Sequence, residues 1–334
     1  MERVDCDLCG GSNFTPFIQS KDYINRTEGL FQTVKCSGCG LVFTNPRPRK
    51  DEILNFYPDS YPSYSQGESY TPSKFVKGIY RKLLEYYFGY MPHNSKGILS
   101  KIILSPVSIF KLGAFYTNAV PAFVKGGRLL EIGAAHGKFL HEMQGLGWEV
   151  NGIELSSYAA GLAKELYGLD VINTDSDDAK FDMAYFDVII MKMVLEHVYS
   201  PDKTLETIAR WLKPGGHLII TVPDISGIEA KLFKKYFFGL HLPNHLYHFS
   251  PETIRKYFVK HELSIEKIYH IKDTRDFKKS VDILLEENPS AMLPRFLNSR
   301  VFKLVRKPLL LLLFSLRRSS RMTIYAKSEK GRPA

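Results

Sequence analysis

The 334-residue sequence lacks any apolar run of the roughly 18–20 residues that a membrane-spanning helix needs. Its first residues, MERVDCDLCGG, contain no apolar core segment of the kind that marks a secretory leader. Internal repeats and long low-complexity tracts are also missing. These absences argue against a spanning helix and against a repeat architecture. With 44% apolar and 24% charged residues, the composition favours a cytoplasmic globular protein.

Acidic residues are missing from two long stretches, although the formal net charge of the chain is only +10. No Asp or Glu occurs between Glu85 and Glu131, or between Glu287 and Glu329, and both stretches are rich in cations and large apolar residues. One interpretation is that they form cap helices on the core. The other is an anionic membrane partner, with leucines in the interface and Lys and Arg at the head groups. Because the cations are mixed with leucines instead of stacking aromatics, the pattern argues against nucleic acid as a partner.

Cysteine is scarce, and all four copies lie in the first 39 residues. Cys6, Cys9, Cys36 and Cys39 form two C-x-x-C pairs, CDLCGG and CSGCGL, each followed by glycine. Two such pairs can present four thiolates to one Zn²⁺ at tetrahedral angles. Two disulfides are the alternative, but thiols stay reduced in the cytosol. We therefore predict a zinc ribbon over residues 1–45, with a structural metal because four protein ligands leave no open coordination position.

The most informative stretch is LLEIGAAHGKFLHEMQGLGWEVNGIE, residues 129–154. A short apolar strand ends at Gly133, and Gly133 and Gly137 bracket a tight turn whose backbone a ligand can approach, because glycine has no Cβ. Apolar residues at helical spacing follow, and Glu154 closes a second strand. An acid at that position can accept both hydroxyls of a ribose. Glu131 would repel a pyrophosphate, so the pattern predicts a ligand with a cationic end instead of a dinucleotide.

With these residues the chain resembles the class I S-adenosylmethionine-dependent methyltransferases, whose cofactor carries an ammonium, a sulfonium and a ribose. The resemblance covers roughly residues 115–270 and includes the apolar strand from Val188 to Met191. In LKPGGHLIITVPD, Pro214-Gly215-Gly216 is expected to form a turn between a helix and the fifth strand. SRMTIYAKS is the candidate for the last, antiparallel strand. The resemblance implies an α/β, Rossmann-like, doubly wound seven-stranded sheet with a small N-terminal zinc ribbon and helical additions.

The resemblance also implies a cofactor site at the carboxyl ends of the strands. Its residues would be Glu131, Gly133 and Gly137 on the methionine side, Glu154 at the ribose, Asp175 at the adenine amino group, and Met191 and Lys192 beside the sulfonium. Asp177 and Asp178 compete with Asp175 for the adenine position. A solvated acidic loop is the alternative for all three.

A methyl acceptor must lose a proton, so a base is expected near the end of the fourth strand. In LEHV, Glu196 and His197 suit this role, because a histidine can remove a hydroxyl proton and a carboxylate can hold its tautomer. The alternative is that they only begin the next helix. The same phrase occurs in ubiquinone-pathway O-methyltransferases, where an extra upstream glutamate helps to bind a divalent metal. Met193 stands there in this chain, so no catalytic metal is expected. In HLPNHLYHFSPETI, His245 is predicted to lie nearest the acceptor, and His248 to pack at a helix start.

The predicted organisation has three parts: a zinc ribbon over residues 1–45, a linker, lid and cap helices over 46–124, and a methyltransferase domain over 125–334. The last part would contain a helical insertion at about 278–318. The cysteines and the phrase LVFTNPRP also resemble the zinc-binding leader of sugar methyltransferases from deoxysugar and surface-polysaccharide pathways.

The predicted function is methyl transfer from S-adenosylmethionine to a hydroxyl or carbon of a nucleotide-sugar or lipid-linked glycan. Alternatives are a quinone or lipid O-methyltransferase at the membrane surface, an RNA methyltransferase that docks through the ribbon, and a cofactor sensor without activity. Tyr57, Tyr61 and Tyr64 could line a lid over the acceptor or could pack along a surface loop. The expected location is the cytoplasm, with peripheral contact at the inner membrane surface under the membrane interpretation.

Overall fold

The computed structural model describes residues 1–56, 84–85, 88–90, 119–271, 274–290, 292–299, 302 and 319–329. The predicted lid tyrosines, most of the predicted cap helices and the leucine-rich part of the predicted insertion lie outside these residues. The predicted membrane-binding stretches fall largely in the same regions. These predictions therefore stay predictions.

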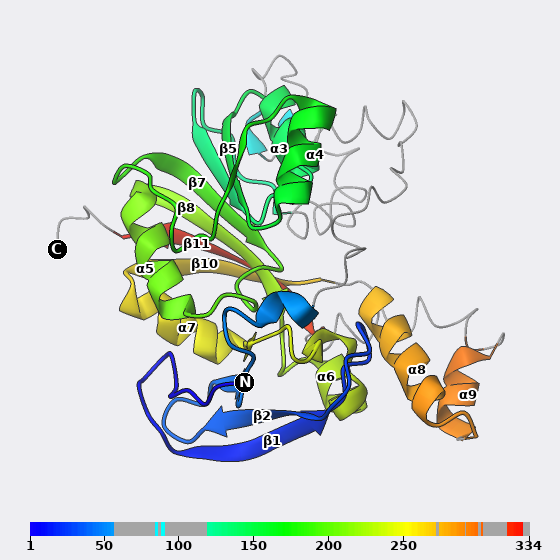
Figure 1. Ribbon diagram of the computed structural model, residues 1–334. Coiled ribbons are helices and arrows are strands. Elements are labelled where there is room, and N and C mark those ends of the chain that lie inside the picture. Colours follow the sequence, from blue (N-terminus) through cyan, green and yellow to red (C-terminus); the bar gives the residue numbers. More distant parts are fainter. Residues whose placement is uncertain are drawn as a thin grey trace, which may run out of the picture.

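A seven-stranded sheet forms the centre of the molecule (Figure 1). Its strands in spatial order are β10 (Leu263–His270), β11 (Arg321–Ser328), β8 (Leu212–Pro223), β7 (Phe186–Lys192), β4 (Arg128–Ile132), β5 (Glu149–Glu154) and β6 (Val171–Asn173). The strands from β8 to β6 are parallel, whereas β11 runs antiparallel to both of its neighbours. The chain winds outward from β4 to β6 and then returns to the other side of β4, which creates a topological switch point. This order confirms the predicted doubly wound sheet.

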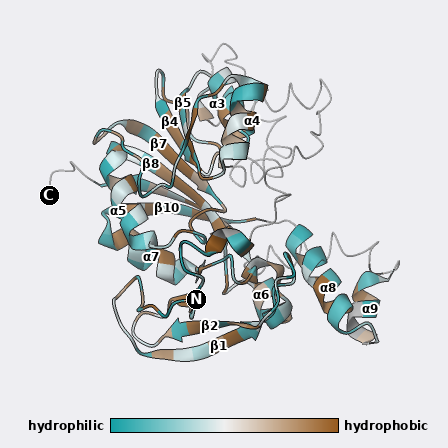
Figure 2. Cartoon of the chain, in the orientation of Figure 1, coloured by the Kyte–Doolittle hydropathy of each residue, from teal (hydrophilic) through white to brown (hydrophobic). Residues whose placement is uncertain are grey.

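Helices cover both faces of this sheet because the central strands are apolar on both sides, as is usual for buried parallel strands. In β4, Leu129 packs in one core cluster with Leu140 of α3 (Lys138–Gly145), whereas Leu130 packs in another with Leu205 of α5 (Pro201–Trp211). Figure 2 shows this as hydrophobic colour along the central strands. Helix α4 (Ser157–Tyr167) shares the side of α3, and α7 (Pro251–Lys260) shares the side of α5.

Three further helices lie beyond the sheet: α6 (Ile228–Phe233), α8 (Arg275–Glu287) and α9 (Met292–Asn298). Short 3₁₀ turns occur at Ile53–Phe56, Lys234–Tyr236 and Phe238–Leu240. Helices α8 and α9 fall within or next to the predicted helical insertion. No helix among the described residues has both the length and the apolar character needed to cross a bilayer.

The predicted turn at residues 214–216 is wrong in one respect, because these residues lie inside β8 and not ahead of it. Phe186 of β7 pairs with Leu212, but Val188 pairs with His217, so the intervening residues of β8 bulge out of register. Pro214, Gly215 and Gly216 favour a turn locally, but β8 pairs with β7 both before and after these residues. The strand therefore absorbs the extra residues as a bulge.

A second, four-stranded antiparallel sheet contains the cysteine segment. Its order is β1 (Phe14–Ser20), β2 (Phe31–Cys36), β3 (Val42–Thr44) and β9 (Tyr247–His248). Figure 1 shows β1 and β2 beside α6 and α7. Strand β9 comes from the segment after β8, so the N-terminal residues share a sheet with the predicted methyltransferase domain. Leu41 and Phe43 also pack in the same core cluster as Leu130. The boundary at residue 45 stays a prediction.

Candidate functional site

The turn between β4 and α3 lies at the carboxyl edge of the sheet, beside the switch point. Gly133 and Gly137 have φ angles of 75° and 77°, in the left-handed region that favours glycine. The N–H of Gly133 donates to the carbonyl of Ile153 in β5 at 2.8 Å. A Cβ on Gly133 would lie 2.3 Å from Val194 Cγ2, and one on Gly137 would lie 2.9 Å from Ala163 Cβ. Both positions therefore require glycine for packing as well as for backbone conformation.

Glu154 lies at the end of β5, next to this turn. Its Oε2 accepts the N–H of Ala135 at 2.8 Å, and its Oε1 accepts the N–H of Ser156 at 2.9 Å. Burial raises the pKa of the carboxyl, and these backbone hydrogen bonds oppose that rise. Each oxygen keeps a further acceptor position, so Glu154 can still accept the hydroxyls of a ribose.

Glu131 and Lys192 lie together at the ends of β4 and β7. Lys192 Nζ is 2.8 Å from Glu131 Oε1 and lies 3.4 Å from the centre of the Phe139 ring. Burial raises the pKa of Glu131, and the charge of Lys192 opposes the rise. Lys192 therefore contacts the carboxylate that the sequence assigned to a cationic ligand. The other oxygen, Oε2, is buried and has no hydrogen-bond partner among the described residues.

Asp175 follows β6 and pairs with Lys50 Nζ at 2.9 Å, a contact that the sequence did not predict. Burial alone would raise the pKa of Asp175, but the hydrogen bond from Lys50 and other donors outweigh burial and lower it. Asp177 instead accepts a hydrogen bond from Thr204 of α5 at 3.1 Å, and Asp178 is exposed. Of the three competing acids, Asp175 remains the candidate for adenine.

The side chain of Met191 is fully buried in the core cluster that contains Leu205 and Ile208 of α5. Because side chains alternate along a strand, Lys192 takes the opposite orientation and reaches Glu131. The structure thus brings together the glycine turn, both glutamates and Lys192, while it places the Met191 side chain in the core.

A second polar group lies where β7 leads into α5 and the segment after β8 returns to meet it. Glu196 is fully buried, and neither carboxyl oxygen has a hydrogen-bond partner among the described residues. His245 Nε2 lies 4.0 Å from Glu196 Oε1, and the rings of His197 and His245 have centroids 4.6 Å apart. The three candidate catalytic residues are therefore neighbours. Their ligand atoms lie within 4.8 Å of one another, close enough to be considered for a metal ion.

The tautomers of both histidines follow from their backbone partners. Nδ1 of His197 lies 3.0 Å from the carbonyl of Asn244, and Nδ1 of His245 lies 3.0 Å from that of Gly239. A carbonyl can only accept, so each Nδ1 donates and the lone pair of each neutral ring is on Nε2. Burial lowers the pKa of His197 to about 4 and that of His245 well below its usual value. Both rings are therefore neutral near pH 7 and can accept a proton.

Two further residues lie near this group, and the sequence had suggested no individual role for either. Asn244 Nδ2 donates to the carbonyl of Phe56 at 3.0 Å, while its buried Oδ1 has no partner among the described residues. His241 lies with its ring centroid 4.9 Å from that of His245. His241 belongs to the histidine-rich phrase, which was a usable signal, whereas nothing in the pattern distinguished Asn244. His248 is buried beside Thr44 Oγ1, 3.5 Å away, in agreement with a packing role.

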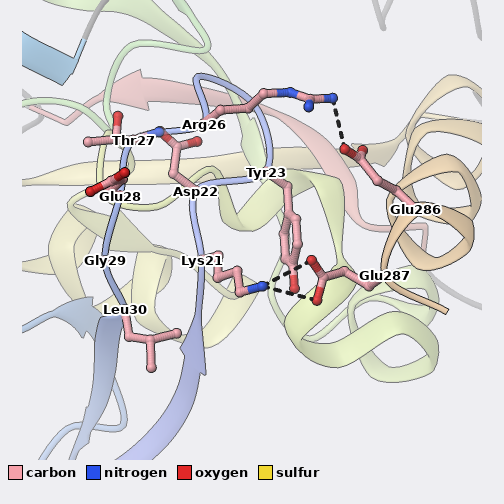
Figure 3. Close-up of a pocket in the computed structure, with 10 residues that line it drawn as sticks. All are labelled: Lys21, Asp22, Tyr23, Arg26, Thr27, Glu28, Gly29, Leu30, Glu286 and Glu287. Atoms are coloured by element: carbon pink, nitrogen blue, oxygen red, sulfur yellow. Dashed lines mark hydrogen bonds and ion pairs between the residues drawn. The ribbon is translucent and has the colours of Figure 1, made fainter.

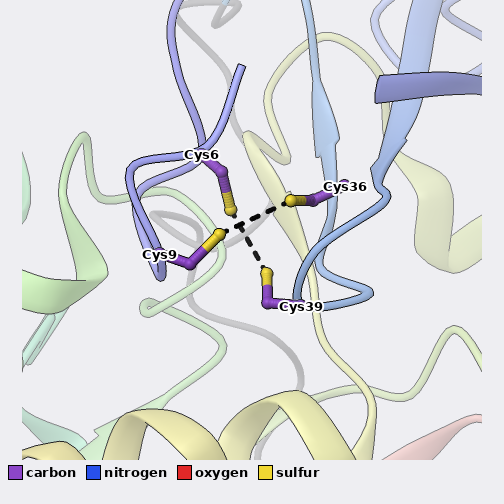
Figure 4. A group of neighbouring side chains, drawn as sticks. All are labelled: Cys6, Cys9, Cys36 and Cys39. Carbon is purple, nitrogen blue, oxygen red and sulfur yellow. Dashed lines mark hydrogen bonds between the residues drawn. The ribbon is translucent and has the colours of Figure 1, made fainter. Parts of the chain in front are cut away.

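The four cysteines converge on one point (Figure 4). Cys6 Sγ lies 3.4 Å from Cys39 Sγ, and Cys9 Sγ lies 3.6 Å from Cys36 Sγ. These separations are far longer than a disulfide bond, and all four thiols are free. In both C-x-x-C turns the N–H of the glycine after the second cysteine donates to the carbonyl of the first, at 2.7 and 2.9 Å. The two matching turns fit a four-thiolate metal site.

A surface hollow of about 510 Å³ lies between the β1–β2 loop and the end of α8 (Figure 3). The ion pairs Lys21–Glu287 at 3.1 Å and Arg26–Glu286 at 2.9 Å connect the two elements. None of the predicted site residues lines it. Because these charged side chains pair with one another, we assign no ligand to this hollow.

Residues 110–268 match the family model described as a methyltransferase domain. The ubiquinone biosynthesis O-methyltransferase of Azoarcus sp. (strain BH72) is 32% identical over 143 residues, which are 40% of this chain and 59% of that protein. Its counterpart from Burkholderia vietnamiensis is 36% identical over 102 residues, 28% of this chain and 44% of that protein. The chain thus spans about half the length of the curated relatives it matches.

The solved structure of an S-adenosylmethionine dependent methyltransferase from Mesorhizobium loti is similar over 63% of this chain and 95% of that chain, at 15% identity and a TM-score of 0.43. The assignment rests on the family match and on the strand order described above. Residues 110–268 thus match a methyltransferase domain, and the described sheet has the mostly parallel, Rossmann-like α/β fold of such domains.

The buried carboxyl of Glu196 predicts a pH-dependent contribution to stability. Burial raises its pKa to about 8, whereas the ordinary value is 4.5. Between these values only the folded state holds the proton, so this group makes the free energy of unfolding fall as pH rises, by at most about 1.4 kcal/mol per pH unit. Because Glu196→Gln cannot ionise, its stability relative to wild type should rise from pH 5 to about pH 8 in chemical denaturation and then level off. A stability difference that stays constant across this range would contradict the assignment.

Proposed function

We propose that the protein transfers a methyl group from S-adenosylmethionine to a hydroxyl or carbon of a nucleotide-sugar or lipid-linked glycan. The observation that carries the proposal is the presence of two complementary half-sites at one edge of the sheet. One consists of the glycine turn with Glu131 and Glu154. The other consists of Glu196 with two neutral imidazoles, those of His197 and His245.

The donor half fits the proposed cofactor, which supplies a methyl group on a sulfonium when bound. Glu154 would accept the ribose hydroxyls with the lone pairs that the backbone leaves available. The second oxygen of Glu131 has no donor among the described residues, and an ammonium group would satisfy it. Asp175 would accept from the adenine amino group, with Lys50 holding the carboxylate ionised.

The acceptor half would remove the proton that the acceptor loses. His197 and His245 both carry the lone pair on Nε2, and the pKa of each ring is low enough to keep it neutral near pH 7. Either Nε2 can therefore accept a hydrogen bond from a substrate hydroxyl and take its proton as the methyl group is transferred, when the oxygen becomes strongly acidic. Glu196, with a pKa raised to about 8, is mostly protonated at that pH and can donate one hydrogen bond of its own.

A hydroxyl-rich acceptor is favoured by the unsatisfied acceptors at this site. Both oxygens of Glu196 and Oδ1 of Asn244 are buried without a hydrogen-bond partner among the described residues. Leaving a buried acceptor unpaired costs about 1–3 kcal/mol per group. A sugar carries several hydroxyls on one rigid ring, and each hydroxyl can both donate and accept, so a sugar would satisfy Asn244 Oδ1 and the protonated carboxyl of Glu196 together. We therefore place a sugar ahead of an apolar acceptor.

A phenolic or quinol acceptor is the second candidate. It is supported by the names of the curated relatives, ubiquinone biosynthesis O-methyltransferases, and by the phrase LEHV with Glu196 and His197. Met193 occupies the position where those enzymes are expected to have a metal-binding glutamate. Proton removal by a histidine is therefore our proposal for either acceptor class. Peripheral binding to an anionic membrane would suit a lipid-linked glycan or a quinol.

We also propose that the four cysteines bind one structural zinc ion. Their sulfur atoms lie close enough to share an ion, and all four protein ligands are supplied by two matching turns. The metal would stabilise the N-terminal segment without taking part in methyl transfer.

The donor half predicts the effect of removing the charge of Glu154. Glu154→Gln should weaken binding of S-adenosylhomocysteine about 10- to 100-fold, because hydrogen bonds to a charged group contribute about 1.5–3 kcal/mol. Glu149→Gln, an exposed position on the same strand, should change the affinity less than about twofold. Isothermal titration calorimetry measures both. If wild type binds neither the cofactor nor its demethylated product but binds a nicotinamide dinucleotide, the donor assignment is wrong.

The acceptor half predicts which replacement abolishes turnover. Release of S-adenosylhomocysteine should be followed with nucleotide-sugars, extracted glycan lipids, a catechol and RNA as acceptors. His245→Ala should lower kcat at least about 100-fold with the productive acceptor while cofactor affinity is retained. His141→Ala, on the exposed side of α3, is the control and should turn over normally. Turnover that requires added Mg²⁺ or Mn²⁺ would replace the proposed base by a metal at Glu196, His197 and His245.

The zinc proposal predicts one equivalent of zinc per chain in elemental analysis of the purified protein. Four thiols should become titratable only after the metal is released, because the thiolates are its ligands. Less than about half an equivalent of zinc, together with thiols that are fully reactive in the folded protein, would rule out the site.

A further inference from the structure

The histidine loop, defined here as residues 241–248, is bound by the cysteine ribbon as well as by the methyltransferase domain. Val42 of β3 pairs with His248 of β9, and Phe43 pairs with Tyr247. The loop therefore forms the last strand of the ribbon's sheet and does not belong to the seven-stranded sheet. The position of His245 depends on this junction, because only Leu246 separates His245 from the start of β9.

Within the ribbon, Thr44 forms hydrogen bonds with His245 and with the residue that follows it. The threonine is fully buried, and its Oγ1 donates to the carbonyl of His245 at 2.8 Å. Its N–H donates to the carbonyl of Leu246, also at 2.8 Å. The hydroxyl thus satisfies a buried carbonyl of the histidine itself, which a valine of the same shape could not do.

The opposite side of the loop is bound by the segment that carries the other two candidate catalytic residues. The carbonyl of Glu196 accepts the N–H groups of Leu246 at 2.8 Å and Tyr247 at 3.2 Å. His197 Nδ1 donates to the carbonyl of Asn244 at 3.0 Å. The histidine loop is therefore held between two partners, and β3 supplies one of them.

The second cysteine pair leads directly into β3, and the N–H of Cys36 donates to the carbonyl of Leu41 at 2.9 Å. Cys39 precedes β3 by two residues, and its carbonyl accepts a hydrogen bond from Lys256 of α7 at 2.7 Å. A second segment of the ribbon also reaches the loop, since Asn25 Nδ2 lies 3.3 Å from His241 Nε2. The ribbon's link to the donor half is weaker. Just after the ribbon, Lys50 pairs with Asp175, but the lysine side chain is 56% exposed, and such exposed pairs contribute little.

We propose that the cysteine ribbon is a structural part of the acceptor half of the active site, and that Thr44 is the positioning residue through which it orients His245. Occupation of the cysteine site by its metal then keeps the histidine loop ordered, while cofactor binding is largely independent of it. The role of an ordered histidine loop in catalysis rests on the proposed function, but the order of the loop can be measured without any methyl acceptor.

The test compares Thr44→Val with Thr44→Ser in the full-length, metal-loaded protein. Hydrogen exchange measured by mass spectrometry, and modification of His245 by diethyl pyrocarbonate, should both be at least about tenfold faster in Thr44→Val. Thr44→Ser keeps the hydroxyl and should return both rates to wild type. Exchange in residues 128–154 and the affinity for S-adenosylhomocysteine should change less than about twofold in either variant.

Thr33→Val is the matched control. Thr33 is also fully buried and pairs with Thr44 in the register of β2 and β3, but its Oγ1 donates to the carbonyl of Ile18 in β1 at 3.0 Å and not to the histidine loop. This variant should leave modification of His245 at the wild-type rate. If Thr33→Val accelerates it as much as Thr44→Val, or if Thr44→Val has no effect, the positioning role of Thr44 is refuted.

The metal half of the proposal is tested by releasing the metal with a chelator and a mercurial thiol reagent. Modification of His245 should accelerate at least about tenfold while S-adenosylhomocysteine still binds, and added Zn²⁺ with thiol reductant should reverse the change. A histidine loop that stays protected in metal-free protein would overturn this half. Absence of methyl transfer with every acceptor would refute the proposed function without affecting these readouts.

Discussion

The shared direction of the parallel strands is the constraint on which the candidate site depends. Because β4, β5 and β7 all end at one edge of the sheet, residues distant in sequence become neighbours there. Glu154 and Lys192 are the last residues of their strands at this edge, and Glu131 is the last but one of β4. The reversal of winding between β4 and β7 then places the glycine turn beside the segment that leads to Glu196. The donor and acceptor halves are therefore adjacent as a result of the strand order alone.

The acceptor half combines burial with polar atoms that have no hydrogen-bond partner among the described residues. The backbone carbonyls of Asn244 and Gly239 take the Nδ1 protons of the two histidines, so the ring nitrogens that remain for chemistry are acceptors. The buried carboxyl of Glu196 adds two oxygens without a partner among the described residues, one of which carries a proton near pH 7. Buried polar atoms without partners lower the stability of the ligand-free protein, and a ligand that forms hydrogen bonds with them removes this cost. Burial also keeps the imidazoles neutral, which is the state that a proton acceptor needs.

The sequence predicted those features that depend on neighbouring residues. The strand, glycine turn, helix and second strand of residues 129–154 are encoded by local periodicity, and the seven-stranded order followed from the phrases that resemble the methyltransferase family. Contacts made by pairing between distant segments could not be predicted this way. The β3–β9 pairing and the Lys50–Asp175 pair join segments with no shared pattern. The burial of Met191 depends on strand register, and the bulge in β8 reflects pairing with β7 that outweighs local turn chemistry.

The close approach of Gly133 to Val194 has an evolutionary consequence. Glycine at 133 leaves room for the branched Val194, which stands two residues before Glu196. A homologue with alanine at 133 must therefore carry a smaller residue at 194, or must shift the start of the acceptor segment. The two candidate half-sites are thus sterically coupled through one contact. Substrate preference and cofactor geometry would then diversify together along a lineage instead of drifting separately.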